Sequence, residues 1–214
     1  MKSIYLIFAF LLINELYAIN VGDKVKLPSP VMEGGMPLYE ALTKRESLRV
    51  FDPDKRVNSQ IISQALWTCY GVNRKDSKLR TTPSAKGWFP LLVYVFLEEG
   101  VFLYDALDNS LTKKFDGDFR YLTGTQTDLV NNARINFVFV ADFKKPSAMD
   151  PDEQHKLRSI YLDTGHCAMA LSLYAAANDM KGVDRAMVEP DPLLEFLGLP
   201  KDDYIFTLAF SLGF

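Results

Sequence analysis

Two short clusters in this chain combine arginine with residues suited to binding an anion. Arg45 and Arg49 flank Ser47, so two guanidinium groups and one hydroxyl can converge on a small region. Guanidinium binds phosphate through paired hydrogen bonds, and hydroxyl and backbone N–H groups complete such sites. The second cluster, at 80–85, reads Arg-Thr-Thr-Pro-Ser-Ala and precedes an apolar run at 91–97. Together the clusters predict a site for a phosphorylated ligand.

Each cluster also has a simpler interpretation. Arginines near a helix end are commonly solvated or paired with nearby acids, here Glu46 and Asp52. Pro83 and Ser84 can form nothing more than a turn that enters a strand. Asn73 follows a glycine that ends a helix, and it either caps that helix or binds a ligand. The spacing of the clusters, which fits one helix and its connecting loop, favours the binding interpretation.

The composition is that of a folded domain with a substantial core. Of the 214 residues, 48% are apolar and 24% are charged, the formal net charge is −3 and the isoelectric point is near 5.5. These values support a single domain. The basic residues form local clusters and no broad patch, so we expect no nucleic-acid partner.

The first 18 residues differ in kind from the rest of the chain. Lys2 gives a positive start, an apolar run covers 4–13, and Ala18 is a small residue at a suitable cleavage position. This pattern predicts a signal peptide at 1–18 and an exported domain at 19–214, in a periplasm, outside the cell or in a secretory lumen. An uncleaved anchor is the alternative, although the run is shorter than the roughly 20 residues that span a bilayer. We expect no membrane span in the mature chain.

The two cysteines, Cys69 and Cys167, lie in apolar helical patterns. Export would permit a disulfide, but buried free cysteine is common in such patterns and is the favoured interpretation. Neither cysteine has the neighbours of a metal site or a redox pair, so we expect no metal. His166 follows Gly165 at an expected helix start, and the sequence offers no catalytic nucleophile or general base.

Hydrophobic periodicity and turn residues divide the chain into elements. The pattern predicts helices at 37–44, 59–70, 128–133, 165–180 and 192–197. It predicts strands at 91–97, 101–105, 135–140 and 204–210, the first two forming a hairpin. The helix at 165–180 is apolar nearly all round and should be the central buried helix. Helices and strands do not alternate regularly, so the fold class is α+β.

The order and spacing of several motifs resemble a known family. From about residue 22 to the C-terminus, the motifs are 37–42, 45–51, 65–67, 71–74, 80–85, Gln126 with Ala133, 163–166 and 193–200. They resemble the FMN-dependent nitroreductases, and most closely the branch related to thiazoline/oxazoline dehydrogenases, which includes exported members. The resemblance implies a mixed sheet flanked by helices, in an intertwined homodimer with FMN at the dimer interface.

The resemblance also implies three groups of cofactor-binding residues: one at the FMN phosphate and ribityl chain, one lining the flavin from the second subunit, and one beside the ring near N5. In that order they are Arg45, Glu46, Ser47 and Arg49; Pro83, Ser84 and Ala85; and Arg185, Ala186 and Met187. Gln126 would bond the ribityl chain or the ring, and Asn73 is a further candidate.

The function that the resemblance implies is that of a flavin oxidoreductase. The flavin carries the redox chemistry and the protein supplies position and electrostatics. The donor would be a reduced compound such as NAD(P)H, and the acceptor a small nitroaromatic or quinone-like molecule. The chain departs from the family at Met169, where Gln is usual, and at 86–90, where Asn or Gln usually meets the ring. The alternative is therefore a non-catalytic exported dimer with lost or weakened FMN binding.

Overall fold

The computed structural model describes residues 19–146 and 152–214, so the predicted signal peptide at 1–18 lies outside the described residues. The elements, including two short 3-10 helices (η), are β1 (Lys24–Lys26), α2 (Leu38–Lys44), α3 (Ser59–Tyr70), β2 (Val72–Arg74), β3 (Leu79–Arg80), η1 (Ala85–Gly87), β4 (Leu91–Leu97), β5 (Gly100–Asp105), β6 (Ser110–Asp116), η2 (Arg120–Thr123), α4 (Thr127–Asn132), β7 (Ile135–Asp142), α5 (Glu153–Ala177), β8 (Lys181–Arg185), α6 (Pro190–Phe196) and β9 (Tyr204–Gly213).

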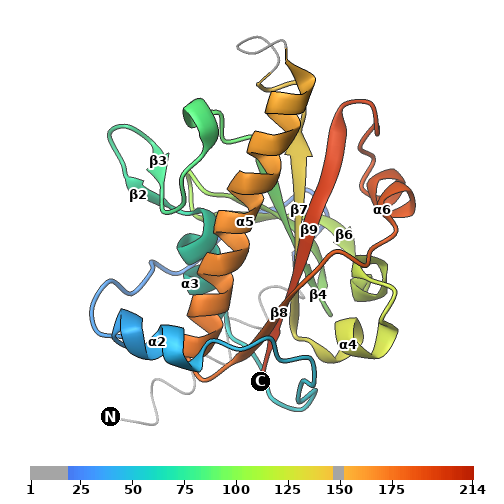
Figure 1. Ribbon diagram of the computed structural model, residues 1–214. Helices are drawn as coiled ribbons and strands as arrows, with labels where there is room; N and C mark the ends of the chain where they lie inside the picture. Colours follow the sequence, from blue (N-terminus) through green and yellow to red (C-terminus); the bar gives the residue numbers. More distant parts are fainter. Residues whose placement is uncertain (1–18, 147–151) are drawn as a thin grey trace.

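A seven-stranded sheet organises the molecule, with strand order β1-β6-β5-β4-β7-β9-β8, and β2 pairs separately with β3 (Figure 1). The expected α+β fold, with a sheet flanked by helices, is confirmed. Within the described residues every strand pairing is antiparallel, so this chain by itself supplies none of the parallel pairs of a mixed sheet. Strand β8 forms one edge of the sheet, and the segment that carries Arg45 and Arg49 lies next to this edge.

The interior strand β7 shows how the sheet separates two cores. Phe137 and Phe139 point to one face, and Val138 and Val140 point to the other, because side chains alternate along a strand. The first face is covered by α3 and α5, and the second by α6 (Figure 1). Both faces of β7 are therefore buried, which explains its continuous apolar run.

Helix α5 begins earlier than the sequence predicts. It runs from Glu153 to Ala177. Asp152 caps it, because its side chain accepts hydrogen bonds from the backbone N–H groups of Gln154 and His155. Gly165 and His166 consequently lie inside the helix and not at its start. The first half is polar, with buried side chains such as Lys156 and Asp163, and this composition concealed the helical pattern.

Other elements are close to prediction or were missed. Helix α3 and strand β4 have the predicted bounds. The predicted strand at 204–210 continues to Gly213. Strands β6 and β8 were not predicted, because lysine, arginine and aspartate interrupt their apolar positions.

Two further expectations can be compared with the described chain. Cys69 and Cys167 are free and buried, as the favoured interpretation held. Among residues 19–146 and 152–214, no helix combines the length and the apolar character needed to cross a bilayer.

Candidate functional site

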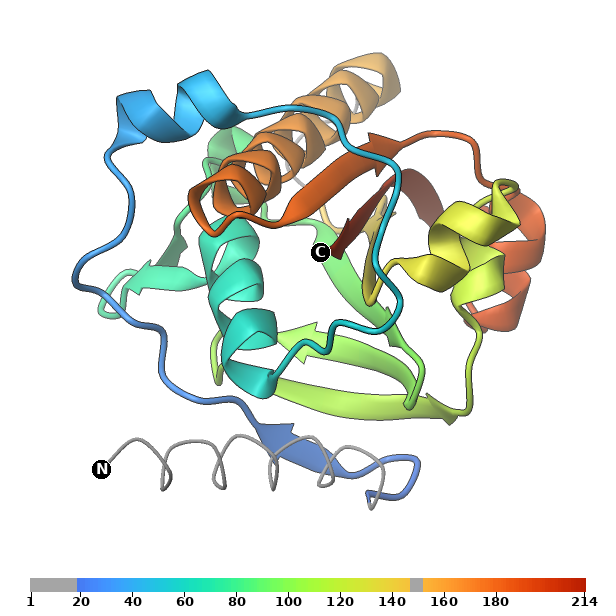
Figure 2. The ribbon, with the colours of Figure 1, turned by 90° about the horizontal axis from the view of Figure 1, so that it is seen from below.

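The segment after α2 brings the first arginine cluster to the edge of the sheet. The Leu48 N–H donates to the carbonyl of Gly182 in β8 at 3.1 Å, and the Asp52 N–H donates to the carbonyl of Phe214 at 2.6 Å. Gly182 itself lets β8 lie close to the core, since an added Cβ would lie 2.7 Å from the Phe210 ring. Figure 2 shows this segment running past the C-terminus toward α3. Residues 45–51 are therefore fixed against β8 through their backbone.

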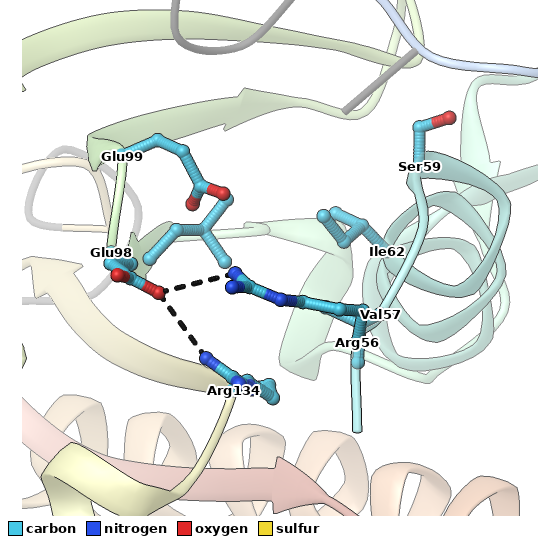
Figure 3. A pocket seen from close by; sticks show the side chains of 8 residues that line it. Arg56, Val57, Ser59, Ile62, Glu98, Glu99 and Arg134 are labelled. Carbon is cyan, nitrogen blue, oxygen red and sulfur yellow. Dashed lines mark hydrogen bonds and ion pairs between the residues drawn. The ribbon is translucent and has the colours of Figure 1, made fainter. Parts of the chain in front are cut away.

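An ion-pair cluster holds the far end of the same segment. Figure 3 shows the Glu98 carboxylate between two guanidinium groups, 3.5 Å from Arg56 and 3.2 Å from Arg134. The Arg134 Nε also donates to the carbonyl of Lys55. The adjacent cavity, of about 20 Å³, has room for little more than one water molecule. This cluster is an anchor and leaves no space for a substrate.

The two arginines of the first cluster have no carboxylate partner. Within the described residues neither Arg45 nor Arg49 forms an ion pair, with Glu46, Asp52 or any other acid. The one recorded hydrogen bond of the Arg49 guanidinium is a long one, 3.5 Å, to the carbonyl of Ser47. Glu46, Ser47 and Arg49 are exposed. Both guanidinium groups are thus available to an anion.

Arg45 lines an open hollow of about 360 Å³ between its own segment, α5 and the sheet. The other lining residues are Tyr161, Thr164, Gly165, Ala168, Met169, Ser172, Asp184, Thr207 and Leu208. The sequence did not single out Asp184, which adds an acidic residue to the lining of this hollow. Met169, where the family usually has Gln, faces this hollow, so the departure falls at the candidate site.

Arg49 lines a second open hollow of about 390 Å³, which it shares with Gln126. Asp128 and Asn132 of α4 also line this hollow. The Thr125 N–H donates to the carbonyl of Met187 at 3.1 Å, which places Met187 beside Gln126. Ala186 and Met187 are exposed. Arg49, Gln126 and Met187 were predicted from distant parts of the sequence, and the structure brings them together. We call the edge of the hollow where these three residues lie the rim.

Arg185 does not face this rim. Its side chain is buried and donates to Ser211 Oγ, Asn136 Oδ1 and the carbonyl of Thr123. Burial lowers the pKa of Arg185 to about 10. Gly124 makes room for it, because an added Cβ there would lie 2.1 Å from the guanidinium. The Arg185 side chain thus bonds the core beneath the exposed Ala186 and Met187, and the predicted place of residues 185–187 beside a flavin ring stays a prediction.

The second cluster lies on the other side of α5. The Ser84 hydroxyl donates to Asp163 Oδ2 at 2.6 Å, and the Ala85 N–H donates to Asp163 Oδ1 at 3.0 Å. Pro83 is exposed. None of these loop residues lines the Arg45 hollow or the Arg49 hollow of the same chain. Asp163 was visible in the sequence only as part of a motif, without an assigned role.

Asn73 is separate from both groups. It lines a different hollow, of about 740 Å³, with Trp67, Lys75, Lys78 and Leu107 among its walls. Its side-chain oxygen accepts a hydrogen bond from Arg74 Nε at 3.0 Å. The structure therefore does not bring Asn73 to the rim. In the described part of the chain, no three His, Cys, Asp or Glu side chains gather where they could hold a metal ion.

Comparison with known proteins places this geometry in context. A profile of the nitroreductase family matches residues 42–214. A protein assigned as a nitroreductase from Ralstonia eutropha JMP134 is 31% identical, with a TM-score of 0.82 over 92% of this chain and 91% of that one. A search of curated proteins found no match.

Two more distant structures show likeness of fold alone. One, assigned as a nitroreductase from Desulfovibrio desulfuricans and solved in complex with FMN, is 16% identical, with a TM-score of 0.60 over 84% of this chain and 87% of that one. The other, the NADPH:FMN oxidoreductase from Vibrio harveyi complexed with NAD+, is 15% identical, with a TM-score of 0.58 over 82% and 67%.

Proposed function

Because the chain belongs to the nitroreductase family, we propose that it is an FMN-dependent oxidoreductase. The observation that carries the proposal is that, within the described residues, neither Arg45 nor Arg49 has a carboxylate partner, while Arg49 shares a hollow with Gln126. Two guanidinium groups four residues apart, on a segment bonded to β8 through the Leu48 backbone, suit a phosphate group. The FMN complex of a relative supports the choice of ligand.

The candidate cofactor-binding residues fit the parts of FMN in different ways. Arg45 and Arg49 would hold the phosphate, with the exposed hydroxyl of Ser47 between them. Gln126 offers both a donor and an acceptor to the ribityl chain or the ring edge. Bound FMN would supply two-electron transfer between a donor and an acceptor. Ala186 and Met187 carry no acid or base, so these residues orient the ring and leave access to the second substrate.

A second copy of the chain would complete the site. The exposed apolar side chains of α2 and α5 support a homodimer: Leu38, Tyr39 and Leu42, and Tyr161, Leu162 and Met169. Surface patches of this kind mark interfaces, and those of obligate dimers are large and apolar. By resemblance, Pro83, Ser84 and Ala85 of one copy would line the flavin of the other. A monomer mass by light scattering at micromolar concentration would contradict this assembly.

The finer assignments are also proposals. NAD(P)H as donor is supported by the NADPH:FMN oxidoreductase among the structural relatives. A nitroaromatic or quinone-like acceptor and the thiazoline/oxazoline dehydrogenase branch rest on the motifs. Export rests on Lys2 and the apolar run at 4–13. N-terminal sequencing from the native host should find a start near Ile19, and an intact Met1 would refute export.

The visible absorption spectrum of the purified protein tests the cofactor. We expect the absorption of an oxidised flavin, bleached by dithionite or NADPH and restored by a quinone. A protein that remains colourless and shows no saturable binding of added FMN would overturn the proposal. That result would favour the alternative, a non-catalytic dimer, for which Met169 in the Arg45 hollow is the supporting observation.

A further inference from the structure

Asp163 carries a carboxylate that is buried inside the protein. It lies in the middle of α5 and is 4% exposed. Within the described residues no lysine or arginine forms an ion pair with it. Burial raises the pKa of Asp163, while the hydrogen bonds it accepts and the nearby His166 lower it. Because an unpaired buried carboxylate is costly, its hydrogen bonds must explain its presence.

All the recorded hydrogen bonds of this carboxylate come from one loop. Ser84 Oγ lies 2.6 Å from Asp163 Oδ2, and the Ala85 N–H donates to Oδ1 at 3.0 Å and to Oδ2 at 3.3 Å. Ser84 Oγ in turn accepts from the Phe89 N–H at 2.9 Å. A continuous chain of donors and acceptors therefore runs from Phe89 through Ser84 to the helix.

The loop needs such support because its backbone is strained. Lys86 has φ of 50° and Phe89 has φ of 47°, in the left-handed region that residues with a Cβ rarely adopt. Gly87, at 69°, adopts the same region without that penalty. The conformation of residues 84–89 is therefore not one the loop would adopt from its own preferences. Bonds from outside the loop must stabilise it, and Asp163 accepts them.

We propose that Asp163 is a positioning residue, which holds Pro83, Ser84 and Ala85 in the orientation that receives the flavin of a second copy. The inference rests on the proposed function and adds the device that presents the loop. The next residue, Thr164, lines the Arg45 hollow of the same chain. Helix α5 would thus fix both halves of the site, one for each flavin of the dimer.

Two measurements on the full-length protein test this role. The first is trypsin cleavage after the exposed Lys86 in FMN-free protein, mapped by mass spectrometry and normalised to cleavage after Lys78 in the β2–β3 turn, which is remote from Asp163. The second is the FMN dissociation constant. We expect Asp163→Ala to raise relative cleavage and the dissociation constant about tenfold each, because the loop opens locally.

Three further variants control for shape and stability. Asp163→Asn has the shape of the parent and can still accept from the Ala85 N–H, so both measurements should stay within about threefold of the parent. Ser84→Ala removes one of the two anchors without changing α5 and should give an intermediate effect. Ser63→Ala removes a buried hydroxyl bonded to Pro28 at 2.6 Å, away from the loop, and should change neither measurement.

The outcomes separate this proposal from the proposed function. Unchanged cleavage after Lys86 in Asp163→Ala, or in Ser84→Ala if the first variant does not fold, would refute the anchor whatever the flavin does. Faster cleavage with an unchanged dissociation constant would refute the positioning role. A parent protein that binds no FMN would overturn the proposed function and with it the positioning role, while the cleavage rates would still decide whether Asp163 anchors the loop.

Discussion

Two regions that adjoin β8 use arginine in opposite ways. Beneath the strand, the Arg185 guanidinium is buried and bonded to Thr123, Asn136 and Ser211. Beside the strand, Arg49 is exposed and has only a long bond to its own segment. Residue type alone therefore does not reveal the role of an arginine. The number of internal acceptors within its reach decides whether it stabilises the chain or remains available to a ligand.

The strongest test of this contrast is Arg185→Ala. The variant leaves buried acceptors without donors, and each such group costs about 1–3 kcal/mol, so we expect the free energy of unfolding to fall by about 3 kcal/mol or more. Urea denaturation followed by circular dichroism measures it. Arg49→Ala is the matched control and should stay within about 0.5 kcal/mol of the parent. If Arg185→Ala kept full stability and lost FMN instead, the contrast would be reversed.

The complementary test removes the arginines of the first cluster. Arg45→Ala and Arg49→Ala should each weaken FMN binding about ten- to a hundredfold, since each removes a charge-assisted contact worth roughly 1.5–3 kcal/mol. Fluorescence quenching of added FMN measures the dissociation constants. Leu48→Met, on the same segment, should bind as the parent does. Equal flavin affinity in all the variants would show that the cluster is structural.

The buried carboxylate of Asp163 should make the free energy of unfolding depend on pH. Burial raises the pKa of Asp163 above its ordinary value of 3.8 in the folded state. The folded protein therefore holds this proton to higher pH than the unfolded chain, and the parent loses stability as pH rises through that interval. Asp163→Asn cannot titrate, so its free energy of unfolding should increase relative to the parent as the pH rises above the ordinary pKa of an aspartate. Paired urea titrations at several pH values would reveal a flat difference if the carboxylate were solvated.

The smallest effect is expected at Glu98, which pairs with two arginines at the surface. Its side chain is 43% exposed, so solvent screens both pairs. Glu98→Gln should cost about 0.5 kcal/mol, and the loss should shrink in high salt. Urea denaturation at two salt concentrations measures this. A loss as large as that of Arg185→Ala would mean that Figure 3 shows a structural centre and not a peripheral anchor.

The sequence predicted those parts of the fold that depend on local apolar pattern. Helix α3 and strand β4 were predicted to the residue because periodicity and flanking glycine and proline define them. Strand β8, with Lys181, Asp184 and Arg185 in five residues, carries no such pattern. The start of α5 was missed because its buried side chains include a lysine and an aspartate, which a pattern analysis counts as surface.

In the candidate site, too, some features could be predicted from the sequence and others could not. Arg49 and Gln126 were chosen from motifs, and the structure gathers them at one hollow. The burial of Arg185 could not be foreseen, because its partners Thr123, Asn136 and Ser211 come from three separate segments. Such non-local acceptors become visible only when the strands are paired.

The two free cysteines give the helix pair a built-in reporter of its motions. Thr82 Oγ1 donates to the backbone carbonyl of Cys69 in α3 at 2.8 Å and lies 3.5 Å from Cys167 Sγ in α5, so Thr82 connects the two cysteine-bearing helices. Burial raises the pKa of Cys167 to about 12 and that of Cys69 well above its ordinary value. A thiol-alkylating reagent reacts with the thiolate, so it can modify either sulfur only when the structure around it opens. The alkylation rate thus measures how often the structure opens at α3 and α5, and the measurement needs no substitution in the chain.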